Sequence, residues 1–166
     1  MDDLSGRLRD AGQALLGLRG ALVAGEPWPL SETWGTEPEA DWGPREVLAH
    51  VAEMLPYWTD ELDRVVAGDG STPVEFGRVA ADPSRLTRID ENRQRPSGAL
   101  LDDIDLGLDR TERFMSGLSE PERRRVGRHP SRGDLTVEAS IERFLVSHLE
   151  DHVEQLRGIL DRRSAA

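Results

Sequence analysis

The 166-residue sequence contains no cysteine and no lysine, so all 21 of its basic residues are arginine. Without cysteine the chain forms no disulfide, offers no thiolate nucleophile and cannot bind zinc through sulfur. No apolar run approaches the roughly 18 residues that a membrane span needs. The N-terminal stretch MDDLSGRLRD also lacks the apolar core of a secretion signal. These absences predict a cytoplasmic protein that does not use a membrane as a partner.

Positive charge is scarce as well, since 21 arginines face 32 aspartates and glutamates and the formal net charge is -11. Binding to nucleic acid requires a basic surface that contacts phosphates, and binding to an anionic membrane requires a similar surface. We therefore exclude nucleic acid and anionic lipid as expected partners. The length suits a single domain, residues 1–166, with a core of useful size.

Apolar residues recur at helical spacing in four segments, which predicts an all-α protein. The segments cover about residues 3–24, 44–67, 97–118 and, starting at 134 or 136, up to 161. Their apolar stripes consist of Leu4, Leu8, Ala11, Leu15, Leu18 and Leu22; Val47, Val51, Met54, Trp58, Leu62 and Val65; Leu101, Ile104, Leu108, Met115 and Leu118; and Val137, Ile141, Leu145, Leu156 and Ile159. Four amphipathic helices in one small domain favour a four-helix bundle.

The connecting segments are harder to interpret. Pro56 lies inside the second segment and is expected to kink or interrupt that helix. Residues 69–96 are predicted to form a long crossover between the second and third helices, with a short helix over 85–94. Residues 119–134 are predicted to form a polar loop, and no window alternates long enough to predict a strand. The long crossover allows an order other than simple up-down-up-down.

Two of the four histidines, His148 and His152, lie four residues apart in the stretch LVSHLEDHVEQL. At about 100° per residue, both fall in the centre of the apolar stripe that contains Ile141. Their rings leave the helix one turn apart, about 6 Å along its axis, so both could bind one metal ion. They could instead be core residues, but two buried imidazoles would each need a hydrogen-bonding partner.

A third ligand could come from His50 in REVLAHVAEML, which lies at the edge of the second apolar stripe. There its ring could point into a cleft between helices, or it could be a hydrogen-bonded core residue. His129 lies in the arginine-rich segment and is expected to be a solvated loop residue. The neighbouring run ERRRVGR is expected to be solvated too, with docking of an anionic group on a substrate as the alternative.

Two carboxylates could support such a site. Glu53 lies one turn after His50, and Asp151 directly precedes His152. Either could orient the second nitrogen of a histidine ligand, although a surface position is the simpler expectation for both. Tyr57 and Trp58 could line the mouth of a pocket or belong to the core.

The stretch DWGPREVLAHVAEM, a long crossover and then HPSRGDLTVEASIERFLVSHLEDHVEQL together resemble the DinB/YfiT-like superfamily over about residues 42–160. The informative parts are the tryptophan followed by LAH at the start of the second helix and the H-x-x-x-H near the C-terminus. The resemblance implies a four-helix bundle with up-down-down-up connectivity. It also implies a divalent metal, often nickel or zinc, held here by His50, His148 and His152.

Members of this superfamily include mycothiol-dependent maleylpyruvate isomerases, bacillithiol and glutathione S-transferase-like proteins, and metal-dependent hydrolases. The isomerases have a glutamate among the three ligands, whereas this chain has histidine at all three positions, which argues against that activity. Relatives often form homodimers, so a homodimer is also expected.

Two functions stay open at this point. The first is a metal-dependent enzyme, either a hydrolase or an S-transferase that takes a small-molecule substrate and a thiol such as mycothiol. Three histidines leave a coordination position open, which is typical of catalytic metal sites. The second is a non-catalytic bundle, linked to stress response, that binds a metal or a partner protein. A fourth protein ligand would favour the second function.

Overall fold

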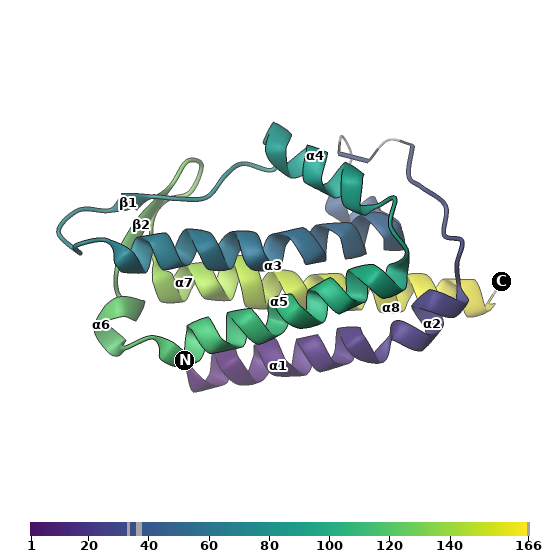
Figure 1. The fold of residues 1–166 in the computed structure, drawn as a ribbon, viewed down its shortest axis with the longest axis horizontal. Coiled ribbons are helices and arrows are strands. Elements are labelled where there is room, and N and C mark those ends of the chain that lie inside the picture. Colours follow the sequence, from purple (N-terminus) through teal and green to yellow (C-terminus); the bar gives the residue numbers. More distant parts are fainter. Residues whose placement is uncertain (33, 36–37, 166) are drawn as a thin grey trace.

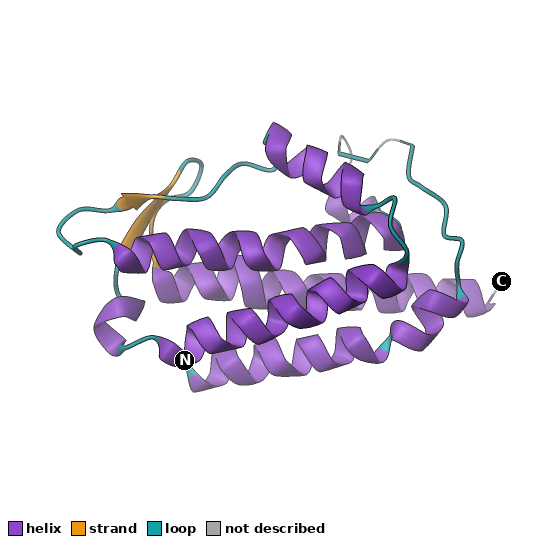
Figure 2. Ribbon diagram, in the orientation of Figure 1, coloured by secondary structure: helices purple, strands orange, loops and turns teal. Residues whose placement is uncertain are grey.

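The computed structural model describes residues 1–32, 34–35 and 38–165. This part of the chain is mostly helical, with a small three-stranded sheet at one end (Figure 2). The longest helices are α1 (Asp2–Gly17), α3 (Pro44–Ala67), α5 (Ser97–Gly117) and α8 (Ser147–Ala165). Helix α5 packs against α1 and α3, and α8 packs against the same two helices from the other side (Figure 1). None of the described helices is long and apolar enough to cross a membrane.

The predicted apolar stripes form the core between these helices. All the stripe residues of the second and third segments are buried, and so are those of the other two segments except Leu18 and Ile159, which are half-buried. Leu18 lies where the first predicted helix divides into α1 and the short α2 (Arg19–Ala24). Burial of each large aliphatic side chain contributes about 1.5–3 kcal/mol, so this pattern accounts for the packing of the helices.

Pro56 was expected to kink or interrupt its helix, and the interruption is wrong, because α3 continues through it. The helix begins with Pro44 at its first position, where a missing N–H costs nothing. Around Pro56, Leu55 and Trp58 are buried, and the Thr59 hydroxyl donates to the Leu55 carbonyl at 2.7 Å. Tertiary packing on both sides therefore outweighs the one backbone hydrogen bond that proline removes.

The crossover between α3 and α5 contains β1 (Val74–Glu75) and α4 (Pro83–Asn92). Helix α4 corresponds to the expected short helix but starts two residues earlier. Asp82 caps it, because its side chain accepts hydrogen bonds from the backbone N–H groups of Ser84 and Arg85.

The expected polar loop at residues 119–134 is instead largely ordered structure, and the all-α prediction is therefore wrong in this region. It forms α6 (Glu120–Arg123), β2 (Val126–His129) and the start of β3 (Gly133–Thr136). Strand β2 pairs in parallel with β1 and antiparallel with β3. These strands were missed because two to four residues are too few to show an alternating pattern.

The fourth predicted helix begins at Thr136, whose side chain accepts from the Ala139 N–H at 3.1 Å. It consists of α7 (Val137–Ile141), a π-helical turn η2 (Glu142–Val146) and then α8. A π-turn has more residues per turn than an α-helix. The angle between Ile141 and the histidines around the helix axis therefore differs from the one calculated at 100° per residue. Such turns often lie at functional sites.

Candidate metal centre

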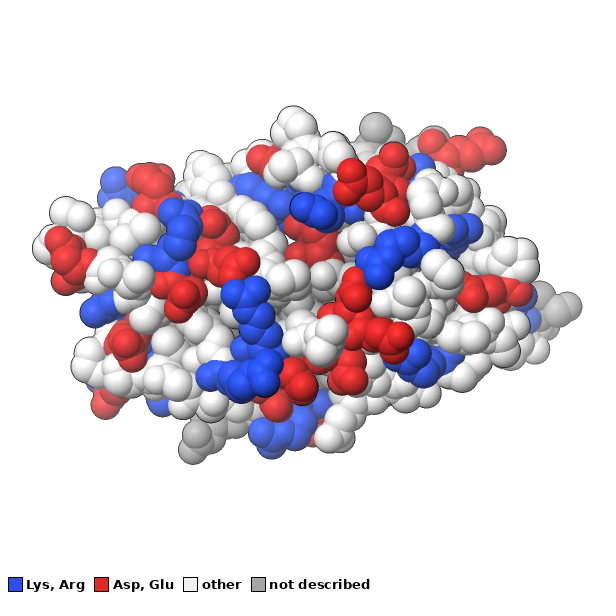
Figure 3. Space-filling view, viewed as in Figure 1, with Lys and Arg blue, Asp and Glu red and all other residues white. Residues whose placement is uncertain are grey.

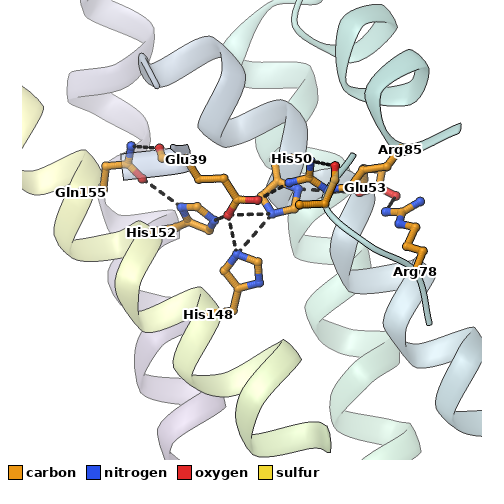
Figure 4. Close-up of polar contacts among 9 residues, drawn as sticks. Glu39, His50, Glu53, Arg78, Arg85, His148, His152 and Gln155 are labelled. Carbon is orange, nitrogen blue, oxygen red and sulfur yellow. Dashed lines mark hydrogen bonds and ion pairs between the residues drawn. The ribbon is translucent and has the colours of Figure 1, made fainter. Parts of the chain in front are cut away.

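Three histidines and one glutamate meet where α3, α8 and the short turn η1 (Glu39–Asp41) come together (Figure 4). His50 comes from α3, His148 and His152 come from α8, and Glu39 comes from η1. Each offers one ligand atom, and the four atoms all lie within 4.8 Å of one another. The structure thus brings together the three histidines singled out from the sequence. Their binding of a metal stays a prediction.

The four side chains of the cluster differ in their exposure to solvent. The side chains of His50 and His152 are only 2% and 3% exposed, whereas those of His148 and Glu39 are 24% and 29% exposed. The cluster therefore has a closed side formed by two buried rings and an accessible side formed by His148 and Glu39.

The separations fit a single small cation. Glu39 Oε2 lies 2.9 Å from His148 Nε2, 3.7 Å from His50 Nε2 and 3.6 Å from His152 Nε2. His50 Nε2 and His148 Nε2 are 3.3 Å apart. Tetrahedral zinc, with bonds of roughly 2.0–2.1 Å, places neighbouring ligand atoms about 3.4 Å apart. These four separations lie within about 0.5 Å of that spacing, and all four donor atoms lie within 4.8 Å of one another.

Glu39 was not found from the sequence. It lies between Pro38 and Pro44, outside any segment with a periodic apolar pattern, so no spacing pattern indicates it. Its position depends on tertiary contacts: Oε1 forms an ion pair with the buried Arg85, and its backbone carbonyl accepts from the Gln155 side chain at 2.7 Å.

Gln155 fixes the protonation of His152. Its amide nitrogen donates to the carbonyls of Glu39 and Trp42, at 2.7 and 3.1 Å, so its oxygen must face His152. His152 Nδ1 lies 3.0 Å from that oxygen and must carry the proton, because the oxygen can only accept. The lone pair of His152 is therefore on Nε2, which is buried and has no hydrogen-bond partner among the described residues.

Glu53 lies beside the Nδ1 atom of His50, as Gln155 lies beside the Nδ1 atom of His152. Its Oε2 is 3.7 Å from His50 Nδ1, which is longer than a hydrogen bond, and its Oε1 forms an ion pair with Arg78. The guanidinium of Arg78 lies 3.6 Å above the ring of Tyr57. Glu53 is buried, so the expected surface position is wrong, and its carboxylate faces His50 Nδ1, as the alternative had it.

Burial and local charge set the protonation states of this group. Burial, helped by the nearby His152 and His148, holds the pKa of His50 well below its usual value. Burial also lowers the pKa of His152 to about 4. For Glu39, burial alone would raise the pKa, but the hydrogen bond and charge of His148 and the charge of Arg85 lower it. At neutral pH the centre thus presents neutral His50 and His152 beside a carboxylate, as a divalent metal requires.

Two hollows reach the donor atoms. A cavity of about 450 Å³ is bordered by Glu39, His50 and His148, and a second of about 440 Å³ is bordered by Glu39, His148 and His152. Both volumes are in the range of small-molecule sites. Asp151 borders both hollows and is exposed, as the simpler expectation had it. The accessible side of the centre can therefore be approached by a small molecule.

His129 is not a solvated loop residue, contrary to expectation. It is 4% exposed, and its ring stacks on Phe144 at 5.1 Å and on Trp58 at 6.0 Å. Trp58 is buried in the core and also borders the first cavity, while Tyr57 is half-buried under Arg78. The burial of His129 comes from these tertiary contacts, which its position beside a proline did not reveal.

No family model, curated protein sequence or solved structure matches this chain. The DinB/YfiT-like superfamily therefore stays an expectation from the sequence alone. The geometry and protonation of His50, His148, His152 and Glu39 are themselves suited to a metal ion.

Proposed function

We propose that the chain is a divalent-metal-binding protein of the DinB/YfiT-like class, in which His50, His148 and His152 hold a zinc or nickel ion. The observation that carries this proposal is the buried lone pair of His152 Nε2, which points at the other donors and has no partner in the described part of the chain. Leaving a buried polar atom unsatisfied costs about 1–3 kcal/mol. A metal ion would satisfy it.

The same proposal includes a four-helix bundle with up-down-down-up connectivity in one domain. The course of the chain in Figure 1 supports it, because α1 and α8 run in one direction and α3 and α5 run in the other. The long crossover at residues 68–96 connects α3 to the parallel α5. Helices α3 and α8 then supply the ligands from opposite directions.

The first candidate activity is that of a metal-dependent enzyme, a hydrolase or a thiol-dependent S-transferase. A bound zinc or nickel ion would supply a Lewis acid that lowers the pKa of a water or thiol ligand. The support lies in the cavity that borders His148 and Glu39. Because the chain has no cysteine, the thiol of an S-transferase reaction would come from a small molecule such as mycothiol.

The second candidate is a non-catalytic metal site, and Glu39 is the specific observation in its favour. A zinc ion with four protein ligands is typical of structural sites, since no coordination position is left for a substrate. Glu39 supplies a fourth donor atom within reach of all three histidines. Catalysis would then require Glu39 to leave the ion or the ion to accept more than four ligands.

Metal uptake tests the proposal directly. The purified, tag-free protein is incubated with excess zinc or nickel, desalted and analysed for metal and protein content. We expect about one ion per chain, lost in the double variant His148→Ala/His152→Ala. His129→Phe is the matched control, because it removes a histidine outside the cluster and keeps an aromatic ring in the stack. Metal uptake that is absent, or that survives in the double variant, would contradict the proposal.

A second measurement separates the two candidates. The zinc-loaded protein and its Glu39→Ala variant are assayed with an activated ester, and with monochlorobimane plus mycothiol or glutathione. Turnover by the wild type that depends on His148 and His152 favours the enzyme. Turnover by neither protein, with the metal retained, favours the non-catalytic site.

A further inference from the structure

Four arginines border the cavity beside the metal centre: Arg78, Arg85, Arg132 and Arg143. The first two are largely buried and form ion pairs with carboxylates of the centre and its surroundings. Arg132 and Arg143 are exposed, and neither has an acidic partner within residues 1–32, 34–35 and 38–165. Asp151 borders the same cavity but forms no ion pair with either of them.

The two unpaired arginines come from different elements that pack together at the cavity. Arg132 lies in the turn between β2 and β3, and Arg143 lies in the π-helical turn η2. The stacked rings of His129 and Phe144, 5.1 Å apart with planes 20° apart, hold these elements against each other. Burial lowers the pKa of His129, and the charges of Arg132 and Arg143 lower it further.

Arg132 and Arg143 differ from most arginines of this acidic chain in having no carboxylate partner among the described residues. The net charge is -11, and most of the arginines are ion-paired with carboxylates, as the mixture of red and blue on the face in Figure 3 illustrates. A guanidinium group binds a carboxylate strongly through charge-assisted hydrogen bonds. Two guanidinium groups without a carboxylate at one cavity are therefore free to bind an anionic ligand.

The wall next to these arginines is aromatic. Trp58 and Phe144 stack face to face, with ring centroids 4.2 Å apart and planes 7° apart, and both border the cavity. The cavity thus combines cationic groups, an apolar wall and, on another side, the donor atoms of His148 and Glu39. This combination suits a small molecule with a carboxylate, an apolar body and a third group that reaches the centre.

We propose that this cavity binds a small organic carboxylate, with the carboxylate on Arg132 and Arg143 and the apolar body against Phe144 and Trp58. The inference deepens the proposed function and rests on it, since it names the ligand class of the same site. Two sources offer this chemistry: an aromatic acid as substrate, or a thiol that itself carries carboxylates, such as glutathione.

Binding is measured by calorimetry on metal-free and on zinc-loaded protein, with benzoate and S-methylglutathione as probes and benzamide as the uncharged match for benzoate. We expect saturable binding of a carboxylate probe to both forms and much weaker binding of benzamide. Arg132→Gln and Arg143→Gln should each weaken binding about tenfold or more, since a charged hydrogen bond is lost. Arg113→Gln is the control: Arg113 is exposed on α5 and away from the cavity, and its change should have no effect.

The probe that binds more tightly identifies the source of the carboxylate. Binding to metal-free protein that depends on the two arginines supports the inference even if the chain takes up no metal, so the two proposals can fail separately. Two results would overturn it. One is no saturable binding of either carboxylate. The other is binding that needs zinc and is unchanged in Arg132→Gln and Arg143→Gln, because the carboxylate would then bind the metal alone.

Discussion

Replacing Gln155 by methionine tests whether a residue outside the four donors sets the state of the metal centre. Methionine has a similar length and helix propensity, so α8 itself should be unaffected. The change removes three hydrogen bonds of the Gln155 side chain, one from His152 Nδ1 at 3.0 Å and two to the carbonyls of Glu39 and Trp42 at 2.7 and 3.1 Å. It therefore releases both the tautomer of His152 and the turn that carries Glu39.

The size of the effect follows from these contacts. At about 0.5–1.5 kcal/mol each, the three bonds predict that the free energy of unfolding of the metal-free protein falls by about 1.5–4.5 kcal/mol. Loss of a group that orients a histidine ligand predicts roughly 10–100-fold weaker metal binding. Urea denaturation measures the first quantity, and competition for zinc with a chelating dye measures the second. Gln13→Met, on the exposed side of α1, is the control and should change neither.

Gln155→Glu separates the two roles of this side chain. A carboxylate can still accept from His152 Nδ1–H but cannot donate to the two carbonyls. We expect zinc affinity near that of the wild type together with a loss of stability. The reasoning would be refuted if Gln155→Met bound zinc as tightly as the wild type, or if both variants lost affinity equally.

Two paired comparisons test other parts of the structure by urea denaturation. Arg85→Gln breaks a largely buried ion pair with Glu39 and should lower the free energy of unfolding by about 2 kcal/mol. Arg110→Gln breaks an exposed pair with Asp60 and should lower it by about 1 kcal/mol or less. Equal losses would contradict the importance given to burial. Gly77→Ala and Gly133→Ala both place alanine at positive φ, which costs about 1–2 kcal/mol. The added methyl group would collide with the buried ring of His129, at 2.5 Å, at Gly77 but would meet nothing at Gly133. Gly77→Ala should therefore lose about 1–3 kcal/mol more, and a loss no larger than that of Gly133→Ala would show that the ring moves away freely.

The helices could be predicted because burial leaves a periodic trace in the sequence, whereas the grouping of His50 with His148 and His152 was implied by the family resemblance. In α3, Val47, Met54 and Leu62 recur on one face, and all are buried. The four-residue spacing of His148 and His152 similarly placed both rings near one point. Residues four apart lie on the same side of a helix whenever the helix forms, whatever the helix packs against.

The remaining parts of the site depend on contacts between distant segments. Glu39 approaches His148 across 109 residues, from a turn with no periodic pattern. His129 is buried because β2 packs against η2, and the π-turn itself has no sequence signal that the apolar pattern could reveal. Such features follow from the packing of the whole chain, so the fourth donor and the place of His129 and Phe144 beside the cavity could only be seen in the structure.

We expect one metal ion between the three histidines, with Glu39 beside it. Anomalous diffraction at the zinc edge, from crystals of the zinc-loaded protein, tests it most directly. We expect one strong peak at roughly 2.0–2.1 Å from an imidazole nitrogen of each of His50, His148 and His152, with a Glu39 oxygen within bonding or hydrogen-bonding distance of the ion or its remaining ligand. A peak held by other residues, or no peak at this cluster in fully loaded protein, would contradict the account.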